Sequence, residues 1–148
     1  RNSAVKKDSV SPVNSEEYFL KNLLDGNPQN RMGFEYLTIY YMLTGQVEKF
    51  ATNIRTIEKL GYKEIPTVFE EGILLYQKLT KNKVEFKNLK IKPETIQKFN
   101  RFQQTHTTFK IKPAQAALLL EKDFGDTYLY YYIFYGTEYS KWKKHMRQ

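Results

Sequence analysis

The sequence contains no cysteine, and this absence excludes several kinds of chemistry. Without thiols the chain can form no disulfide, hold no metal ion through thiolates and use no cysteine nucleophile. Histidine is also scarce, because His106 and His145 are the two present and neither belongs to a His-x-x-x-His or Glu-x-x-His pattern. The sequence therefore predicts no metal site and no cofactor.

Motifs that carry catalysis are missing too. The seven glycines are dispersed, so there is no phosphate-binding loop, and no Gly-x-Ser-x-Gly occurs. Glu70 and Glu71, with Glu35 on a neighbouring helix, could be paired carboxylates for acid–base work. The spacing of Arg31 and Glu35 instead favours a solvated helix face. Since no nucleophile, base or metal ligand can be named, we predict that the protein is not an enzyme.

Long hydrophobic runs are absent as well. The longest uncharged stretches, 36–47 and 127–137, are shorter than the roughly 20 residues that cross a bilayer. The first residue is Arg1, so we expect a processed form or an excised piece, and the compartment stays undetermined. A chain of 148 residues is the size of one domain with a real hydrophobic core.

Aromatic residues and positive charge are what the sequence has in plenty. Aromatic residues make up 16% of the chain, with 12 tyrosines and 10 phenylalanines. Residues 78–92 hold six lysines against one glutamate, and residues 141–148 hold three lysines and one arginine. These two segments account for the whole net charge of +8, so the basicity belongs to a loop at 81–92 and a tail at 141–148.

The first half of the chain predicts four helices. Residues 1–13 are polar and without period, which indicates a linker or N-terminal arm, and a single helical domain follows over 14–148. Apolar residues recur at steps of three and four between glycine and proline signals. The short connections make neighbouring helices antiparallel. The predicted helices are 14–26, 28–45, 46–60 and 66–80.

The second half predicts a loop and three further helices. Residues 81–92 alternate lysines with apolar residues, which favours an extended loop over a short strand. A Lys-Ile-Lys-Pro sequence occurs twice, and Pro93 and Pro113 each open a helix. Residues 128–135 are largely aromatic, which favours a strand, but stop and cap signals precede them. We predict a short helix there, and the fold class is all-α.

A set of spaced residues between Phe34 and Ile57 resembles a tetratricopeptide repeat (TPR). Thr38 and Phe50 depart from the pattern, because both stand where smaller residues are usual, so we expect the helix pair to be spread or tilted. The resemblance implies antiparallel helical hairpins stacked as a short TPR-like right-handed superhelix with a C-terminal helical cap. The residues that carry it are Phe34, Leu37, Tyr41, Gly45, Glu48, Lys49, Ile54 and Ile57.

A wider arrangement, from "NPQNRMGFEYLTIYYMLTGQVEKF" to "FGDTYLYYYIFY", is similar to the soluble C-terminal part of a family of uncharacterised bacterial multi-spanning membrane proteins. The resemblance covers nearly all of 14–135. It implies a soluble helical domain tethered to the bacterial inner membrane, with the membrane portion absent here. It implies no activity.

Three residues are predicted to bind a ligand: Tyr36, Tyr40 and Trp142. Tyr36 and Tyr40 lie on a helix of the kind that lines the groove of repeat proteins, although packing would explain them too. Trp142 in the tail and Phe86 in the loop could stack on bases among lysines. The same lysines could instead lie on an anionic membrane surface, or only keep the protein soluble.

The function hypothesis is a non-catalytic protein-interaction scaffold with an unknown protein partner, one soluble module of a larger membrane-anchored protein. One alternative is a carbohydrate- or peptide-binding domain that uses exposed tyrosine and tryptophan. Another is a weak nucleic-acid binder that uses the basic loop and tail, with an affinity that falls steeply with salt.

Overall fold

The computed structural model describes residues 12–108 and 113–136, and this part of the chain is helical and holds no strand. The all-α prediction is confirmed. The basic tail and nearly all of the predicted N-terminal arm lie outside the described residues. The elements are α2 (Pro12–Gly26), α3 (Arg31–Leu43), α4 (Val47–Ile54), the 3-10 helix η1 (Ile57–Leu60), α5 (Thr67–Thr80), α6 (Pro93–Thr108), α7 (Pro113–Phe124), α8 (Tyr128–Tyr131) and the π-helical turn η2 (Tyr132–Gly136).

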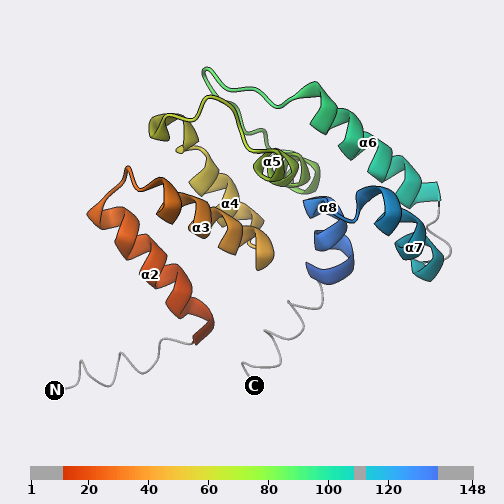
Figure 1. Ribbon diagram of the computed structural model, residues 1–148, viewed down its shortest axis with the longest axis horizontal. Helices are drawn as coiled ribbons and strands as arrows, with labels where there is room; N and C mark the ends of the chain where they lie inside the picture. Colours follow the sequence, from red (N-terminus) through yellow and green to blue (C-terminus); the bar gives the residue numbers. More distant parts are fainter. Residues whose placement is uncertain (1–11, 109–112, 137–148) are drawn as a thin grey trace.

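Helices that follow one another in the chain pack side by side, so α2 to α6 form an arch (Figure 1). The last helix departs from this order. Instead of lying beyond α7, α8 returns to the inner side of the arch and packs against α5. The predicted C-terminal cap therefore does not close the end of the stack. Among the described helices, none combines the length and the apolar character needed to cross a bilayer.

The predicted start of the second helix is wrong by about one turn. Pro28 does not open it; α3 begins at Arg31. The reason is the Asn30 side chain, which accepts a hydrogen bond from Gly33 N at 3.0 Å and so caps the helix. The Asn27 side chain accepts from Gln29 N instead, within the preceding turn.

The predicted helix 46–60 is divided into α4 and η1. The Thr56 hydroxyl donates to the Asn53 carbonyl at 2.9 Å, a local bond that competes with the helical ladder. Gly61 ends the segment in the left-handed region at φ 76°, and Gly45 makes the turn before α4 at φ 68°. The prediction that Gly45 joins two packed helices is confirmed.

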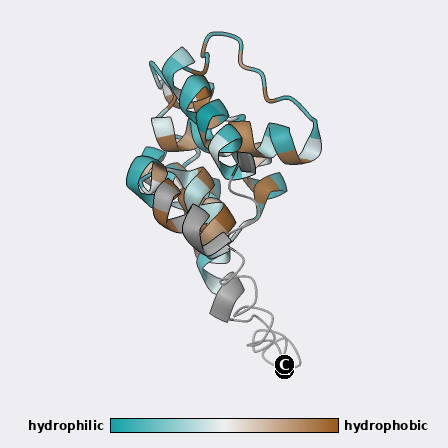
Figure 2. Ribbon diagram, turned by 90° about the vertical axis from the view of Figure 1, so that its right-hand side faces the viewer, coloured by the Kyte–Doolittle hydropathy of each residue, from teal (hydrophilic) through white to brown (hydrophobic). Residues whose placement is uncertain are grey.

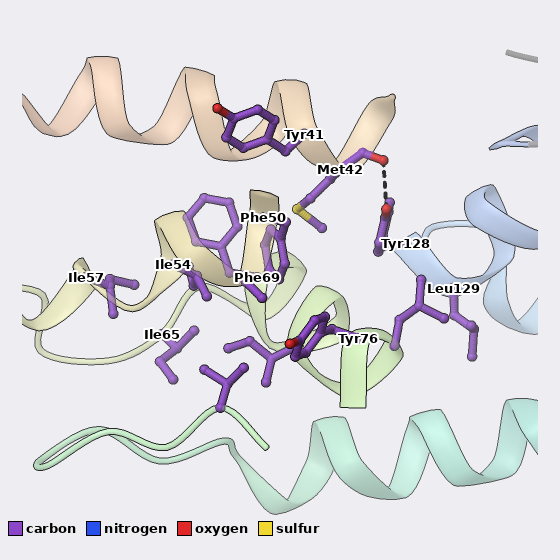
Figure 3. Close-up of a cluster of buried hydrophobic side chains, with 14 of the residues drawn as sticks. Tyr41, Met42, Phe50, Ile54, Ile57, Ile65, Phe69, Tyr76, Tyr128 and Leu129 are labelled. Carbon is purple, nitrogen blue, oxygen red and sulfur yellow. Dashed lines mark hydrogen bonds between the residues drawn. The ribbon is translucent and has the colours of Figure 1, made fainter. Parts of the chain in front are cut away.

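A cluster of buried apolar side chains lies where α3, α4 and α5 meet (Figure 3). A Cβ atom on Gly72 would lie 2.6 Å from Phe50 Cζ and 3.0 Å from Met42 Cε. The large ring of Phe50 is thus accommodated by a missing side chain on the facing helix. The same site also binds α8, because the Tyr128 hydroxyl donates to the Met42 carbonyl at 2.7 Å.

Two adjacent carboxylates of α5 are buried, so the predicted solvated face for Glu70 and Glu71 is wrong. Glu70 accepts hydrogen bonds from Lys92 N at 2.6 Å and from Thr95 Oγ1 at 2.8 Å, and Lys92 Nζ lies 3.2 Å away. Glu71 accepts from Tyr128 N at 3.1 Å. These carboxylates join α5 to the start of α6 and to the start of α8.

We predict that Gly72→Ala lowers the free energy of unfolding. Overpacking against Phe50 costs about 1–3 kcal/mol, which exceeds the gain of at most about 1 kcal/mol from replacing a helical glycine. Urea denaturation measures the difference. Gly26→Ala is the matched control, because no atom lies within 4 Å of the added Cβ, and its effect should stay within about 0.5 kcal/mol. An unchanged Gly72→Ala variant would contradict the tight α4–α5 contact.

We predict opposite effects for the two α5 carboxylates. Glu70→Gln removes the charge that faces Lys92 and should lower the free energy of unfolding by about 2 kcal/mol. For Glu71, burial raises the pKa more than the Tyr128 N–H lowers it. The ionised form is therefore disfavoured in the folded state, and stability is lost as the pH rises through that raised pKa.

Glu71→Gln keeps an acceptor for Tyr128 N and removes the loss of stability that ionisation of Glu71 causes. It should equal or exceed the wild type in free energy of unfolding at neutral pH, with no advantage in acid. Urea denaturation at both pH values makes the comparison, and a Glu71→Gln variant less stable than Glu70→Gln at neutral pH would refute the assignment.

Candidate functional site

An open apolar groove of about 630 Å³ lies between α2 and α3, and we call it the α2–α3 groove. Its walls come from two antiparallel helices whose inner faces meet in the core. Almost all of its lining is apolar, with one serine and one glutamate at the rim. The lining residues are Ser15, Glu16, Phe19, Leu20, Tyr36, Ile39, Tyr40 and Leu43.

The groove exists because α3 is apolar on two faces. Phe34, Leu37 and Tyr41 point into the core and are almost fully buried. A second row of apolar residues runs from Tyr36 to Leu43 on the other side of the helix, with its members three and four residues apart. Although α2 and α4 both pack against α3, Tyr36 and Leu43 on this second side stay exposed to solvent.

The exposed side chains of the groove are large. Phe19 is 62% exposed, Tyr36 is 60% exposed and Leu43 is 46% exposed. Single exposed apolar residues are common on protein surfaces, but several that gather along one groove mark an interaction surface. The groove is therefore the strongest candidate site in the described part of the chain.

The structure brings two of the three predicted ligand-binding residues together in this groove. Tyr36 stands exposed on its wall, whereas Tyr40 is only 9% exposed and belongs to the hydrophobic core. Tyr36 is thus available for contact, and Tyr40 forms the base on which a ligand would rest. Trp142 lies outside the described residues.

A second groove, of about 730 Å³, lies between α2 and α4, and we call it the α2–α4 groove. Phe34, Leu37 and Tyr41 of α3 are its apolar floor. The walls are polar and of mixed charge. They include Lys21, Asp25, Gln29, Glu48, Lys49, Thr52, Asn53, Thr56 and Lys59.

Glu17 joins the three helices that form both grooves. Its carboxylate accepts from the Tyr41 hydroxyl and from Lys49 Nζ, each at 3.0 Å, and Lys21 Nζ lies 3.2 Å away. Burial opposes its ionised form, but the hydrogen bonds from Lys49, Lys21 and Tyr41 outweigh burial, so the pKa of Glu17 falls below its usual value. Two lysines of the α2–α4 groove are therefore already paired.

The sequence pattern indicated Tyr36 and Tyr40 but missed the role of Glu17, for a physical reason. Glu17 is separated from Tyr41 by 24 residues and from Lys49 by 32. A local pattern reports which residues share a helix face, but it does not report which faces of different helices meet. The local signal for the α2–α3 groove was the apolar row on the second face of α3, which includes Tyr36 and Tyr40.

The arrangement offers contact area and fixed polar groups. Across residues 12–108 and 113–136, no three His, Asp or Glu side chains come together as a metal site. His106 stacks on the Phe102 ring, with 6.0 Å between ring centroids, and so has a packing role. Burial and the Glu17 carboxylate both raise the pKa of Tyr41, which keeps its hydroxyl a neutral donor.

Residues 1–135 match the model of a protein family of unknown function, DUF6057, and the chain belongs to that family. Comparison with the curated proteins finds no match, and comparison with the solved structures finds none. The chain's role must therefore be inferred from its grooves and its surface.

We predict that the two groove tyrosines differ in their effect on stability. Tyr40→Ala removes a buried ring and should lower the free energy of unfolding by about 3 kcal/mol. Tyr36→Ala truncates an exposed side chain and should change it by less than about 0.5 kcal/mol. Chemical denaturation of both variants makes the comparison. Equal losses would mean that Tyr36 is a packing residue and is not free for a ligand.

Proposed function

We propose that this member of a family of unknown function is a non-catalytic protein-interaction scaffold, whose α2–α3 groove receives an amphipathic helix from a protein partner. One observation carries the proposal. The side chains of Phe19, Tyr36 and Leu43 stand exposed along a groove that is almost wholly apolar. Leaving such side chains in water is unfavourable, and a partner's apolar face would cover them.

The dimensions of the groove suit a helix. The α3 row runs from Tyr36 to Leu43, which spans about 10 Å along the helix axis, or two turns. A partner helix with apolar residues at steps of three, four and seven presents a stripe of that length. The hydroxyl of Tyr36 would remain at the wet rim, where tyrosine commonly makes a polar contact.

The proposal includes a TPR-like arrangement, with α3 and α4 as one antiparallel pair in a right-handed superhelix. Support comes from the core side chains of the repeat-like pattern, since Phe34, Leu37 and Tyr41 are buried and Gly45 makes the turn. A stack of helix pairs exposes the outer face of its first pair unless another element covers it. In this arrangement the α2–α3 groove would lie on such a face.

We also propose that the scaffold is a soluble module of a larger membrane-anchored protein at the bacterial inner membrane. The support for this context is the sequence resemblance over 14–135. A tethered scaffold of this kind would recruit a partner to the membrane through its two-helix groove. That role needs no catalysis.

A second candidate function is binding of an extended peptide in the α2–α4 groove. Its apolar floor and its polar walls would suit a chain of mixed side chains. Carbohydrate binding has less support in that groove, because its aromatic rings, Phe34 and Tyr41, are almost fully buried and offer no exposed stacking face.

The test is photo-cross-linking in extract of the source cells, with the photoreactive group placed at Leu43 in the wall of the groove. We expect a specific protein adduct that Phe19→Ala/Tyr36→Ala reduces by about tenfold or more, because loss of two apolar anchors costs about 1.4 kcal/mol or more. The matched control is Tyr18→Ala/Met32→Ala, which truncates side chains that are 65% and 62% exposed and do not line the groove.

Two results would overturn the proposal. An adduct reduced equally by both double variants would show that general surface hydrophobicity explains the contact. An adduct lost only in Thr56→Ala/Lys59→Ala would assign the partner to the α2–α4 groove.

A further inference from the structure

In the loop of residues 81–92, between α5 and α6, the apolar side chains pack against the core and most lysines are exposed. Val84 and Leu89 are buried, and Phe86 and Ile91 are half-buried against the core. The lysines between them face solvent. The exposed ones are Lys81, Lys83, Lys87 and Lys90.

The backbone of the loop is held in place although it has no regular structure. Glu58 of η1 accepts hydrogen bonds from Lys87 N at 2.9 Å and from Asn88 N at 2.6 Å. The Gln77 side chain accepts from Val84 N at 3.0 Å. Because Glu70 also holds Lys92 N, the loop is fixed near both ends and in the middle. Its lysines therefore project from fixed backbone positions.

The nearby carboxylates form no ion pair with these lysines. Backbone N–H groups of Lys87 and Asn88 hold the pKa of Glu58 below its usual value, with a smaller contribution from the charge of Lys87. Glu70 pairs with Lys92. Within the described residues, the ion pairs involve Lys21, Lys49, Lys92 and Lys98, and none involves the four exposed lysines. Glu85 is the single acidic residue on the loop.

The loop lies on the outer edge of the arch, away from the ends of the described chain at Pro12 and Gly136 (Figure 1). A second view shows it standing out from the helices (Figure 2). A projecting edge touches a flat surface more readily than it encloses a strand. Four unpaired positive charges on such an edge form a cationic contact surface that is independent of both grooves.

We propose that the loop 81–92 binds the surface of an anionic lipid bilayer through the headgroup phosphates. Lysine acts as a point charge and makes no bidentate contact, which suits a diffuse anionic surface. A nucleic acid is less favoured, because Phe86 packs against the core and the loop offers no fully exposed ring on which a base could stack.

The test is co-sedimentation of the full chain with vesicles of phosphatidylcholine alone and of phosphatidylcholine mixed with phosphatidylglycerol. We expect binding to the mixed vesicles only, and weaker binding as salt rises. Each lysine near an anionic surface contributes about fivefold, so Lys83→Gln/Lys87→Gln/Lys90→Gln should lower the partition coefficient by roughly a hundredfold. Thermal denaturation checks that these exposed substitutions leave the fold intact.

The control with the same change of charge is Lys141→Gln/Lys143→Gln/Lys144→Gln in the basic tail. Retained binding in this control, together with loss in the loop variant, supports the proposal. Equal loss of vesicle binding in both variants would show that net charge alone explains the effect, and this result would overturn the proposal. Binding to the neutral vesicles, or binding to duplex DNA with none to the mixed vesicles, would overturn it as well.

Discussion

The contact between Phe50 and Gly72 is the constraint on which the rest of the structure depends. The Phe50 ring occupies the space that a side chain at position 72 would fill, so α4 and α5 can approach closely only with glycine there. Met42 of α3 completes the contact, and its carbonyl accepts the hydroxyl of Tyr128. Four helices, α3, α4, α5 and α8, thus meet at one point. Phe50 is larger than the repeat-like pattern usually has at its position, and it fits because the facing residue is Gly72.

Around that point, buried carboxylates join the helices that apolar packing alone would leave free to slide. Glu17 connects α2 to α3 and α4, Glu70 connects α5 to the start of α6, and Glu71 connects α5 to α8. Hydrogen bonds are directional, whereas hydrophobic contact is not, so these residues select one alignment among several of similar buried area. Glu17 therefore helps to hold α2 against α3 and α4, and the two grooves lie between these helices.

The remaining surface has two parts that differ in chemistry, and each part is the basis of one functional proposal. The apolar α2–α3 groove lies between the first two helices of the arch, and the lysine loop 81–92 lies on the outer edge of the arch. A scaffold with these two surfaces could bind a partner helix through Phe19 and Tyr36 while its loop contacts an anionic layer. Neither surface needs the other, because each is formed by different elements.

The sequence by itself determined the helical class, the turn at Gly45, the proline-opened α5 and α6, and the extended loop, because each depends on local propensity and on periodicity within one element. It did not determine the start of α3 or the division of residues 46–60 into α4 and η1. It also placed both groove tyrosines on one helix. Only the tertiary structure decided that Tyr36 is exposed and Tyr40 buried, that Glu70 and Glu71 lie inside, and that α8 returns to the middle of the arch. The physical reason is distance along the chain. Periodicity shows which residues share a face, but the element that covers the face is remote, as with Tyr128 and Met42, which are 86 residues apart.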